Sequence, residues 1–247
     1  MNDALARVLP SAADSSRPWL TWYSPDERIE LTGHVLSMWH AKCAGFLTAE
    51  AGPGARVHLG MTPHWRTVTW CAGAWLAGAT PVLLDSGDSF VENLLDEPPS
   101  ISVAFRIHWL FPSADVQVLV TMESLATRWP GPLPPLVLDG VADVMPLADR
   151  FPAVPTDGSA PALQIVRNGE PRTVSRDALV AAAPGTDAEA ALATGARALL
   201  IQRRTTEQAL LGVLAAWRAG LTAVLVSPDA DAAVVASAVR QEGAFRA

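Results

Sequence analysis

Lysine is almost absent from this 247-residue sequence: Lys42 is the only one, and arginine supplies the remaining positive charge. Charged residues make up only 17% of the chain against 50% hydrophobic residues, which excludes a disordered chain and predicts a folded core. The formal net charge of −7 lacks the basic excess that a nucleic-acid partner requires. We therefore expect a globular α/β protein that binds no nucleic acid.

Cysteine is also scarce. Cys43 and Cys71 both fall on apolar faces of expected helices, which predicts buried thiols in a reducing compartment. The N-terminus carries Asp3 and no apolar stretch, so no secretory signal is indicated. Residues 67–84 contain no charge, but Gly78 interrupts them, and a buried core segment is favoured over a membrane span. These features predict a cytoplasmic protein without membrane association.

Common catalytic and metal-binding motifs are missing too. The five histidines show neither the HExxH spacing nor the cysteine partners of a zinc site. The sequence contains no GxSxG nucleophile elbow and no GxGxxG loop after an expected strand. We therefore predict no metal site and no catalytic residues.

What the sequence does contain is one stretch that occurs twice. Residues 56–87 and 198–229 align without a gap, and each predicts a strand, a helix that begins at a threonine, a glycine stop and a second strand. Gly78 and Gly220 lie where a helix end needs a left-handed residue. Two such βαβ units predict an α/β fold with a layered, mostly parallel sheet. The identical pairs are Ala74/Ala216, Trp75/Trp217, Ala77/Ala219, Gly78/Gly220, Thr80/Thr222, Val82/Val224 and Leu83/Leu225.

Turn-forming segments divide the rest of the chain. Residues 1–17 are small and polar and predict a flexible N-terminus. Residues 149–161 are rich in Pro, Gly, Asp and Ser and predict a linker. We expect a first α/β half over residues 18–148 and a second over residues 162–247, as two subdomains of one fold.

Each half contains further expected elements. The turn-forming residues 24–27 predict a hairpin, after which Thr32 begins a helix that ends near Gly52. Lys42 lies on this helix and is expected to be solvated, as lysine usually is. A closing helix is expected over residues 232–242.

The region between the repeats has a looser pattern. Alternating apolar residues over 101–111 predict a strand with one apolar face, at a sheet edge or paired with a neighbouring domain. Short helices are expected over residues 88–95 and 123–128. The proline-rich residues 130–135 predict a stiff surface connection to a following strand.

The order of these elements resembles the start of the adenylate-forming enzymes, the superfamily of acyl-CoA synthetases, luciferases and nonribosomal peptide adenylation domains. Residues 18–22, 30–32, 52–57 and 73–79 are similar to its opening hairpin, its helix entry, its "GPGDRV" strand entry and its "AxxAGA" helix stop. Residues 169–179 are similar to its "GxPKGV" motif and the helix that follows. The whole chain resembles a small group of stand-alone proteins that keep only this N-terminal part. The resemblance implies the N-terminal domain fold of these enzymes.

The motif that would hold ATP departs from the family pattern. In the family, a Ser/Thr/Gly-rich loop wraps the phosphates, whereas residues 163–168 contain no serine, threonine or glycine. Arg172 takes the position of the loop lysine. The family's later adenine and Mg²⁺ motif and its C-terminal catalytic lysine have no counterpart here, and Lys42 lies in the first helix. The resemblance therefore implies a degenerate, non-catalytic relative without a cofactor.

Asn168-Gly169 occupies the place of the phosphate loop. Between two extended runs this pair is typical of a two-residue hairpin turn, because both residues tolerate a positive φ. The alternative is a shortened anion loop that uses Arg167, Arg172 and Arg176. The hairpin is favoured, because it explains the strand-forming residues that lead into the turn.

Candidates for ligand binding lie where the repeat helices begin, since open α/β sheets bind ligands at the carboxyl ends of their strands. Thr62 and Thr205 are explained as helix caps. For His64 a surface position is favoured over a functional one, and for Arg203 and Arg204 a solvated pair is favoured over an anion site. The candidate ligand-binding residues are Thr62, His64, Arg172, Arg203, Arg204 and Thr205.

Two functional hypotheses remain open. In the first, the scaffold is a binding or interaction module whose partner is another protein or a second copy of this chain. In the second, a remnant AMP-binding pocket holds a nucleotide (ATP or AMP), an acyl group or a CoA-like molecule, as part of a ligase. Thermal stabilisation by ligand separates the two, because a ligand at 100 times its Kd adds about 2.7 kcal/mol of stability.

Overall fold

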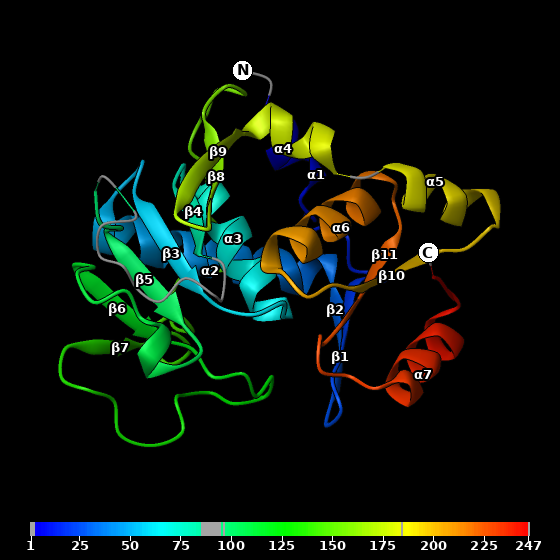
Figure 1. Ribbon diagram of the computed structural model, residues 1–247, viewed down its shortest axis with the longest axis horizontal. Coiled ribbons are helices and arrows are strands. Elements are labelled where there is room, and N and C mark those ends of the chain that lie inside the picture. Colours follow the sequence, from blue (N-terminus) through cyan, green and yellow to red (C-terminus); the bar gives the residue numbers. More distant parts are fainter. Residues whose placement is uncertain (1–2, 85–94, 96, 184, 247) are drawn as a thin grey trace.

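The computed structural model describes residues 3–84, 95, 97–183 and 185–246. These residues form two sheets with helices between them (Figure 1). The small sheet has the order β12-β10-β11-β1-β2. Its strands are β1 (Pro18–Tyr23), β2 (Arg28–Thr32), β10 (Ala198–Gln202), β11 (Thr222–Val226) and β12 (Ala244–Phe245).

The large sheet has the order β7-β6-β5-β3-β4-β8-β9. All of its neighbouring strands are parallel except the β8–β9 hairpin, and in the small sheet only the β1–β2 hairpin is antiparallel. The predicted α/β class with mostly parallel strand pairing is confirmed, although the strands form two sheets where the sequence predicts one. The strands are β3 (Arg56–Gly60), β4 (Thr80–Leu84), β5 (Ile101–Ala104), β6 (Val116–Leu119), β7 (Val137–Asp139), β8 (Pro161–Arg167) and β9 (Glu170–Ser175).

The helices α2, α3 and α6 carry the main core, which joins apolar side chains from both sheets. Within it, Trp22, Trp70 and Trp75 are almost completely buried. Cys43 and Cys71 are buried free thiols, as expected. The helices are α1 (Ala4–Val8), α2 (Gly33–Ala51), α3 (Trp65–Leu76), η1 (Ile107–Trp109), α4 (Arg176–Ala182), α5 (Gly185–Ala193), α6 (Thr206–Arg218) and α7 (Ala232–Glu242). None of those in the described ranges has the length and apolar character needed to cross a membrane.

The two sequence repeats fold as β3-α3-β4 and β10-α6-β11, with identical strand register. Arg56 pairs with Thr80 in the first unit, and Ala198 pairs with Thr222 in the second. The residue that follows each helix cap, Gly78 or Gly220, has a φ of 69° or 73°, the left-handed conformation that the sequence predicts.

The repeat extends beyond the aligned stretch, because a hairpin precedes each unit and is exchanged between the halves. The β1–β2 hairpin of the first half adds to β11, and the β8–β9 hairpin of the second half adds to β4. Thr32 and Ser175 then cap α2 and α4, accepting from Val35 N and Ala178 N at 3.3 Å each. Each sheet therefore combines strands from both halves, and the division into two subdomains remains a prediction.

The N-terminus differs from the flexible segment expected over residues 1–17. It contains the short helix α1, whose Leu5 is completely buried. Asp3 caps this helix and pairs with the buried Arg176, whose Nη2 lies 2.6 Å from Asp3 Oδ2. The ion pair with a buried arginine fixes this segment in place. The composition of residues 1–17 gives no sign of that pairing.

The strand expected over residues 101–111 is mostly wrong. Only β5 forms, and its four residues are all buried between β3 and β6 rather than at an edge. Phe111 N donates to the buried Ser102 Oγ at 2.8 Å, and His58 Nδ1 lies 2.9 Å from the same oxygen. Because these bonds satisfy the Ser102 hydroxyl inside the sheet, this polar position of the alternation is buried, whereas Arg106 and His108, beyond β5, are exposed.

The helix expected over residues 123–128 is also wrong. Arg66, on α3, is buried and donates to the carbonyl oxygens of Glu123, Ser124 and Ala126 at 3.0–3.4 Å. These carbonyl oxygens therefore accept hydrogen bonds from an arginine distant in sequence instead of from the backbone N–H groups of a helix. The helix expected over residues 88–95 falls almost entirely outside the described residues.

Lys42 is buried, contrary to the expectation of a solvated lysine. Its Nζ donates to Met145 O at 2.7 Å and to Leu147 O at 2.5 Å, and it lies 2.7 Å from Asp149 Oδ1. The side chain thus ties α2 to the segment that follows β7. Backbone carbonyls and one carboxylate compensate for the burial of the charge.

Candidate functional site

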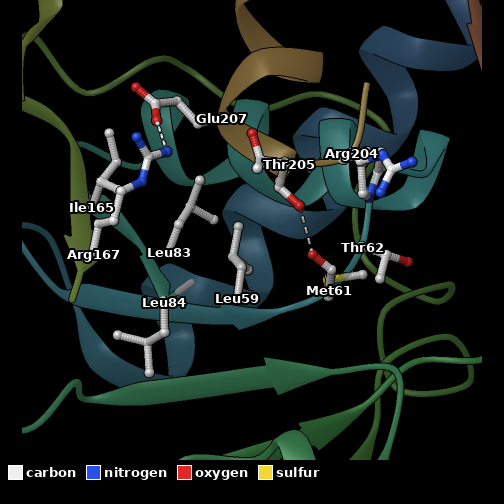
Figure 2. A pocket seen from close by; sticks show the side chains of 12 residues that line it. Leu59, Met61, Thr62, Leu83, Leu84, Ile165, Arg167, Arg204, Thr205 and Glu207 are labelled. Carbon is white, nitrogen blue, oxygen red and sulfur yellow. Dashed lines mark hydrogen bonds and ion pairs between the residues drawn. The ribbon is translucent and has the colours of Figure 1, made fainter. Parts of the chain in front are cut away.

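A cavity of about 100 Å³ lies at the carboxyl ends of β3, β4 and β8, where these strands meet the start of α6 (Figure 2). Leu59, Leu83 and Ile165 give it an apolar floor. Thr205 and Arg204 line the side formed by α6 and the chain before it. The predicted location, at the carboxyl edge of a parallel sheet, therefore contains a concave site.

Three candidate residues from the two repeats come together here: Thr62, Arg204 and Thr205. Thr205 is the N-cap of α6, and its hydroxyl accepts from Gln208 N at 3.3 Å, as the sequence predicts. The next residue, Thr206, donates to Met61 O at 2.8 Å and joins the start of α6 to the end of β3. This bond positions the second repeat against the first at the cavity.

Glu207 is the residue at this site that sequence reasoning missed. It lies in the first turn of α6, where a carboxylate is favoured by the helix dipole. Its oxygens lie 3.2 Å from Arg167 Nη2 and 2.5 Å from Arg172 Nη2. An acidic residue in a first helical turn is visible in a sequence, but its two arginine partners depend on where the β8–β9 hairpin packs.

The β8–β9 connection is the predicted two-residue hairpin turn. Asn168 and Gly169 have φ values of 53° and 80°, and Arg167 pairs with Glu170 across the turn. The hairpin borders a second hollow of about 250 Å³, whose lining includes Arg172. The three arginines of the alternative anion loop do not converge, since the third of them is buried beside α1.

His64 is not the surface residue that the sequence favours. It is only 1% exposed and is itself the N-cap of α3, with Nδ1 accepting from Arg66 N at 3.1 Å. Its ring packs against Trp22 at 4.5 Å between centroids. Burial is the main cause that lowers the pKa of His64 to about 3, so the imidazole is neutral at pH 7. The cap role expected for Thr62 was wrong, because Thr62 lies before this cap.

Arg203 lies outside the cavity lining and pairs with Asp187 of α5 at 3.3 Å. Arg204 is exposed, in agreement with the expectation of a solvated residue. The structure thus brings four of the six candidates to one place, with Arg172 joined through Glu207, and separates His64 and Arg203 from them. In the described part of the chain, no three His, Cys, Asp or Glu side chains are grouped to hold a metal ion.

Comparison with known proteins identifies this architecture. No family model matches the sequence. A protein of Mycobacterium tuberculosis whose name gives only a family number is 40% identical over 78 residues, which are 30% of this chain and 32% of that protein. The matched stretch is thus a similar share of both chains, although it covers less than a third of either.

Solved structures match almost the whole chain. An acyl-CoA synthetase of Brucella canis has a TM-score of 0.79 at 18% identity, and the match covers 99% of this chain and 47% of the synthetase. Acetoacetyl-CoA synthetase of Streptomyces lividans has a TM-score of 0.73 at 17% identity, covering 97% and 41%. VinN, solved with 3-methylaspartate, has a TM-score of 0.68 at 19% identity, covering 97% and 64%.

At these identities the structural matches establish the fold. The chain has the fold of the N-terminal domain of adenylate-forming enzymes, which confirms the resemblance found in the sequence. It spans about half the length of the synthetases or less.

Proposed function

We propose that this chain is a non-catalytic relative of the adenylate-forming enzymes and acts as a binding or interaction module. The observation that carries the proposal is the two-residue turn at Asn168 and Gly169, which the sequence resemblance aligns with the phosphate loop of those enzymes. Strand pairing of β8 with β9 continues up to the turn, so the hairpin presents no run of free backbone N–H groups to a triphosphate.

The charges beside the turn support the same conclusion. Arg172, which the sequence resemblance aligns with the loop lysine, is paired with the Glu207 carboxylate. Glu207 lies only 14% exposed over the first turn of α6, where the partial positive charge of a helix would otherwise attract an anion. A phosphate group entering here would meet this carboxylate and would have to displace it from two arginines.

The size of the cavity also argues against a nucleotide. Its volume of about 100 Å³, and that of about 250 Å³ for the hollow beside the hairpin, are each below the roughly 300–1,000 Å³ of sites that bury a drug-sized ligand. The apolar floor formed by Leu59, Leu83 and Ile165 suits a small aliphatic group better than a purine with phosphates.

The test of this proposal is acid-dependent exchange of pyrophosphate into ATP. The purified chain is incubated with ATP, Mg²⁺, labelled pyrophosphate and a broad panel of carboxylic acids, beside an active acyl-CoA synthetase as the positive control. We expect exchange only in the control. Clear exchange by this chain with any acid of the panel would contradict the proposal.

The second candidate function is binding of a small ligand in the cavity, and the exposed Arg204 beside an apolar floor favours it. Thermal unfolding with ATP, AMP or CoA at millimolar concentration tests it. Under the first proposal the melting temperature stays unchanged. A rise of several degrees with ATP that Arg172→Ala abolishes, and that the exposed control Arg150→Ala retains, would replace the interaction module with a nucleotide site.

A further inference from the structure

The connection between β6 and β7 contains a proline-rich segment, Pro130–Leu136, beside the edge strand of the large sheet. Pro132, Pro135 and Leu136 are exposed, whereas Leu133 is half-buried. Leu133 packs against an apolar cluster beneath it, together with Trp129. One side of the segment is thus attached to the fold and the other faces solvent.

The backbone of this segment is strongly restricted. A proline ring fixes φ near −65°, and a residue that precedes a proline is confined to the extended or polyproline II region. Both restrictions apply over Pro132–Pro135, which belongs to neither a helix nor a strand. In a polyproline II helix, which has three residues in each turn, residues spaced as Pro132 and Pro135 lie on the same side. Their shared exposure, opposite the packed Leu133, agrees with this geometry.

Both ends of the segment are held in place. Trp129 N donates to the buried Asp139 Oδ2 at 2.7 Å. Val137 N donates to Pro134 O at 3.2 Å and closes a turn at the start of β7. Because the segment is already ordered, a partner that binds it loses little conformational entropy.

Leu136 is the most unusual residue of the segment. It is 97% exposed and has a φ of 65°, and Asn168 is the only other non-glycine residue with a positive φ among those described. It is the third residue of a type II turn after Pro135, a position normally occupied by glycine or asparagine. The fold does not require a leucine at this position, and exposing its apolar side chain to water is unfavourable. Strained residues that the fold leaves unexplained are often contact residues.

We propose that residues 132–136 dock into an aromatic-lined groove of a protein partner that recognises polyproline II helices. Pro132 and Pro135 have the PxxP spacing that such grooves bind, and Leu136 extends the apolar contact. The inference rests on the proposed role as an interaction module. A second copy of this chain is a poor partner, because no aromatic side chain in the described ranges belongs to its exposed residues.

The experiment measures binding of the full chain to a panel of purified SH3 and WW domains by biolayer interferometry. We expect at least one domain to bind in the micromolar range. The double variant Pro132→Ala/Pro135→Ala should weaken that binding by about tenfold or more, the effect of losing one or two central contacts. The matched control Pro112→Ala/Pro146→Ala changes two exposed prolines that lack the PxxP spacing and should bind as the unchanged chain does.

Leu136→Gly separates docking from folding. Glycine suits the turn better, so this variant should raise the melting temperature while it weakens binding. The inference is overturned if no domain of the panel binds the unchanged chain. It is also overturned if neither the double proline variant nor Leu136→Gly weakens the binding. Because pyrophosphate exchange is measured separately, loss of this inference leaves the non-catalytic proposal intact.

Discussion

Trp75 and Trp217 make the same hydrogen bond in the two repeats. Trp75 Nε1 donates to Ala162 O at 2.7 Å, and Trp217 Nε1 donates to Trp19 O at 2.9 Å. Each acceptor belongs to the hairpin strand that the opposite half contributes, β8 for the first indole and β1 for the second. The two tryptophans therefore join each helix to the exchanged hairpin beside it.

The equivalence of these bonds predicts equal costs when either is removed. Trp75→Phe and Trp217→Phe should each lower the free energy of unfolding by about 2 kcal/mol, because each loses a buried hydrogen bond and leaves a small cavity. Urea unfolding followed by circular dichroism measures the change. Trp129→Phe, at a half-buried position, serves as the control and should cost less. Two clearly unequal losses would show that the repeats are not energetically equivalent.

The turn at Gly169 predicts a strong dependence on residue type. Gly169→Val should destabilise the fold by about 1–2 kcal/mol, because a β-branched residue is forced to a φ of 80°. Gly169→Asn is the matched comparison, since asparagine tolerates this conformation, and it should cost less than half as much. Thermal unfolding of both variants checks the difference. If both variants lose the same stability, position 169 excludes any side chain, whether or not the residue tolerates a positive φ.

Substitution of Lys42 should change both the overall stability of the fold and the local dynamics of the segment that it contacts. Lys42→Met removes the donor to Met145 O and Leu147 O and should cost about 2–3 kcal/mol. Amide hydrogen exchange should rise over residues 140–150, which this side chain attaches to α2. Arg150→Ala, an exposed change in the same segment, should leave both measurements nearly unchanged. Unaltered exchange in the methionine variant would show that other contacts hold the segment.

Burial of the neutral His40 side chain should make the folded protein less stable in acid. It is completely buried, its ring nitrogens make no hydrogen bond, and burial lowers its pKa to about 3. The unfolded chain takes up a proton near pH 6.5 while the folded chain stays neutral, so stability is full above that pH and falls as the pH drops toward 3. His40→Leu should reduce the loss between about pH 7.5 and about pH 5 by roughly 2 kcal/mol. The exposed His108→Gln is the control, and equal pH dependence in both variants would contradict the assignment.

The sequence by itself determined the features that depend on neighbouring residues. The helix stops at Gly78 and Gly220 and the turn at Asn168-Gly169 follow from which residues accept a positive φ. The helical repeat pattern and the caps are likewise local, since they depend on side chains a few residues apart. These signals were sufficient to predict the two βαβ units and the β8–β9 hairpin turn.

Only the tertiary structure decided which segments meet. A lone lysine is most often solvated, and nothing near Lys42 in the chain indicates that carbonyls after β7 receive its charge. Glu207 became part of the site only because an exchanged hairpin places Arg172 against the start of α6. The burial of His64 likewise depends on Trp22 from the other sheet. Burial and ion pairing between distant segments are set by packing of the whole chain, which local propensity does not encode.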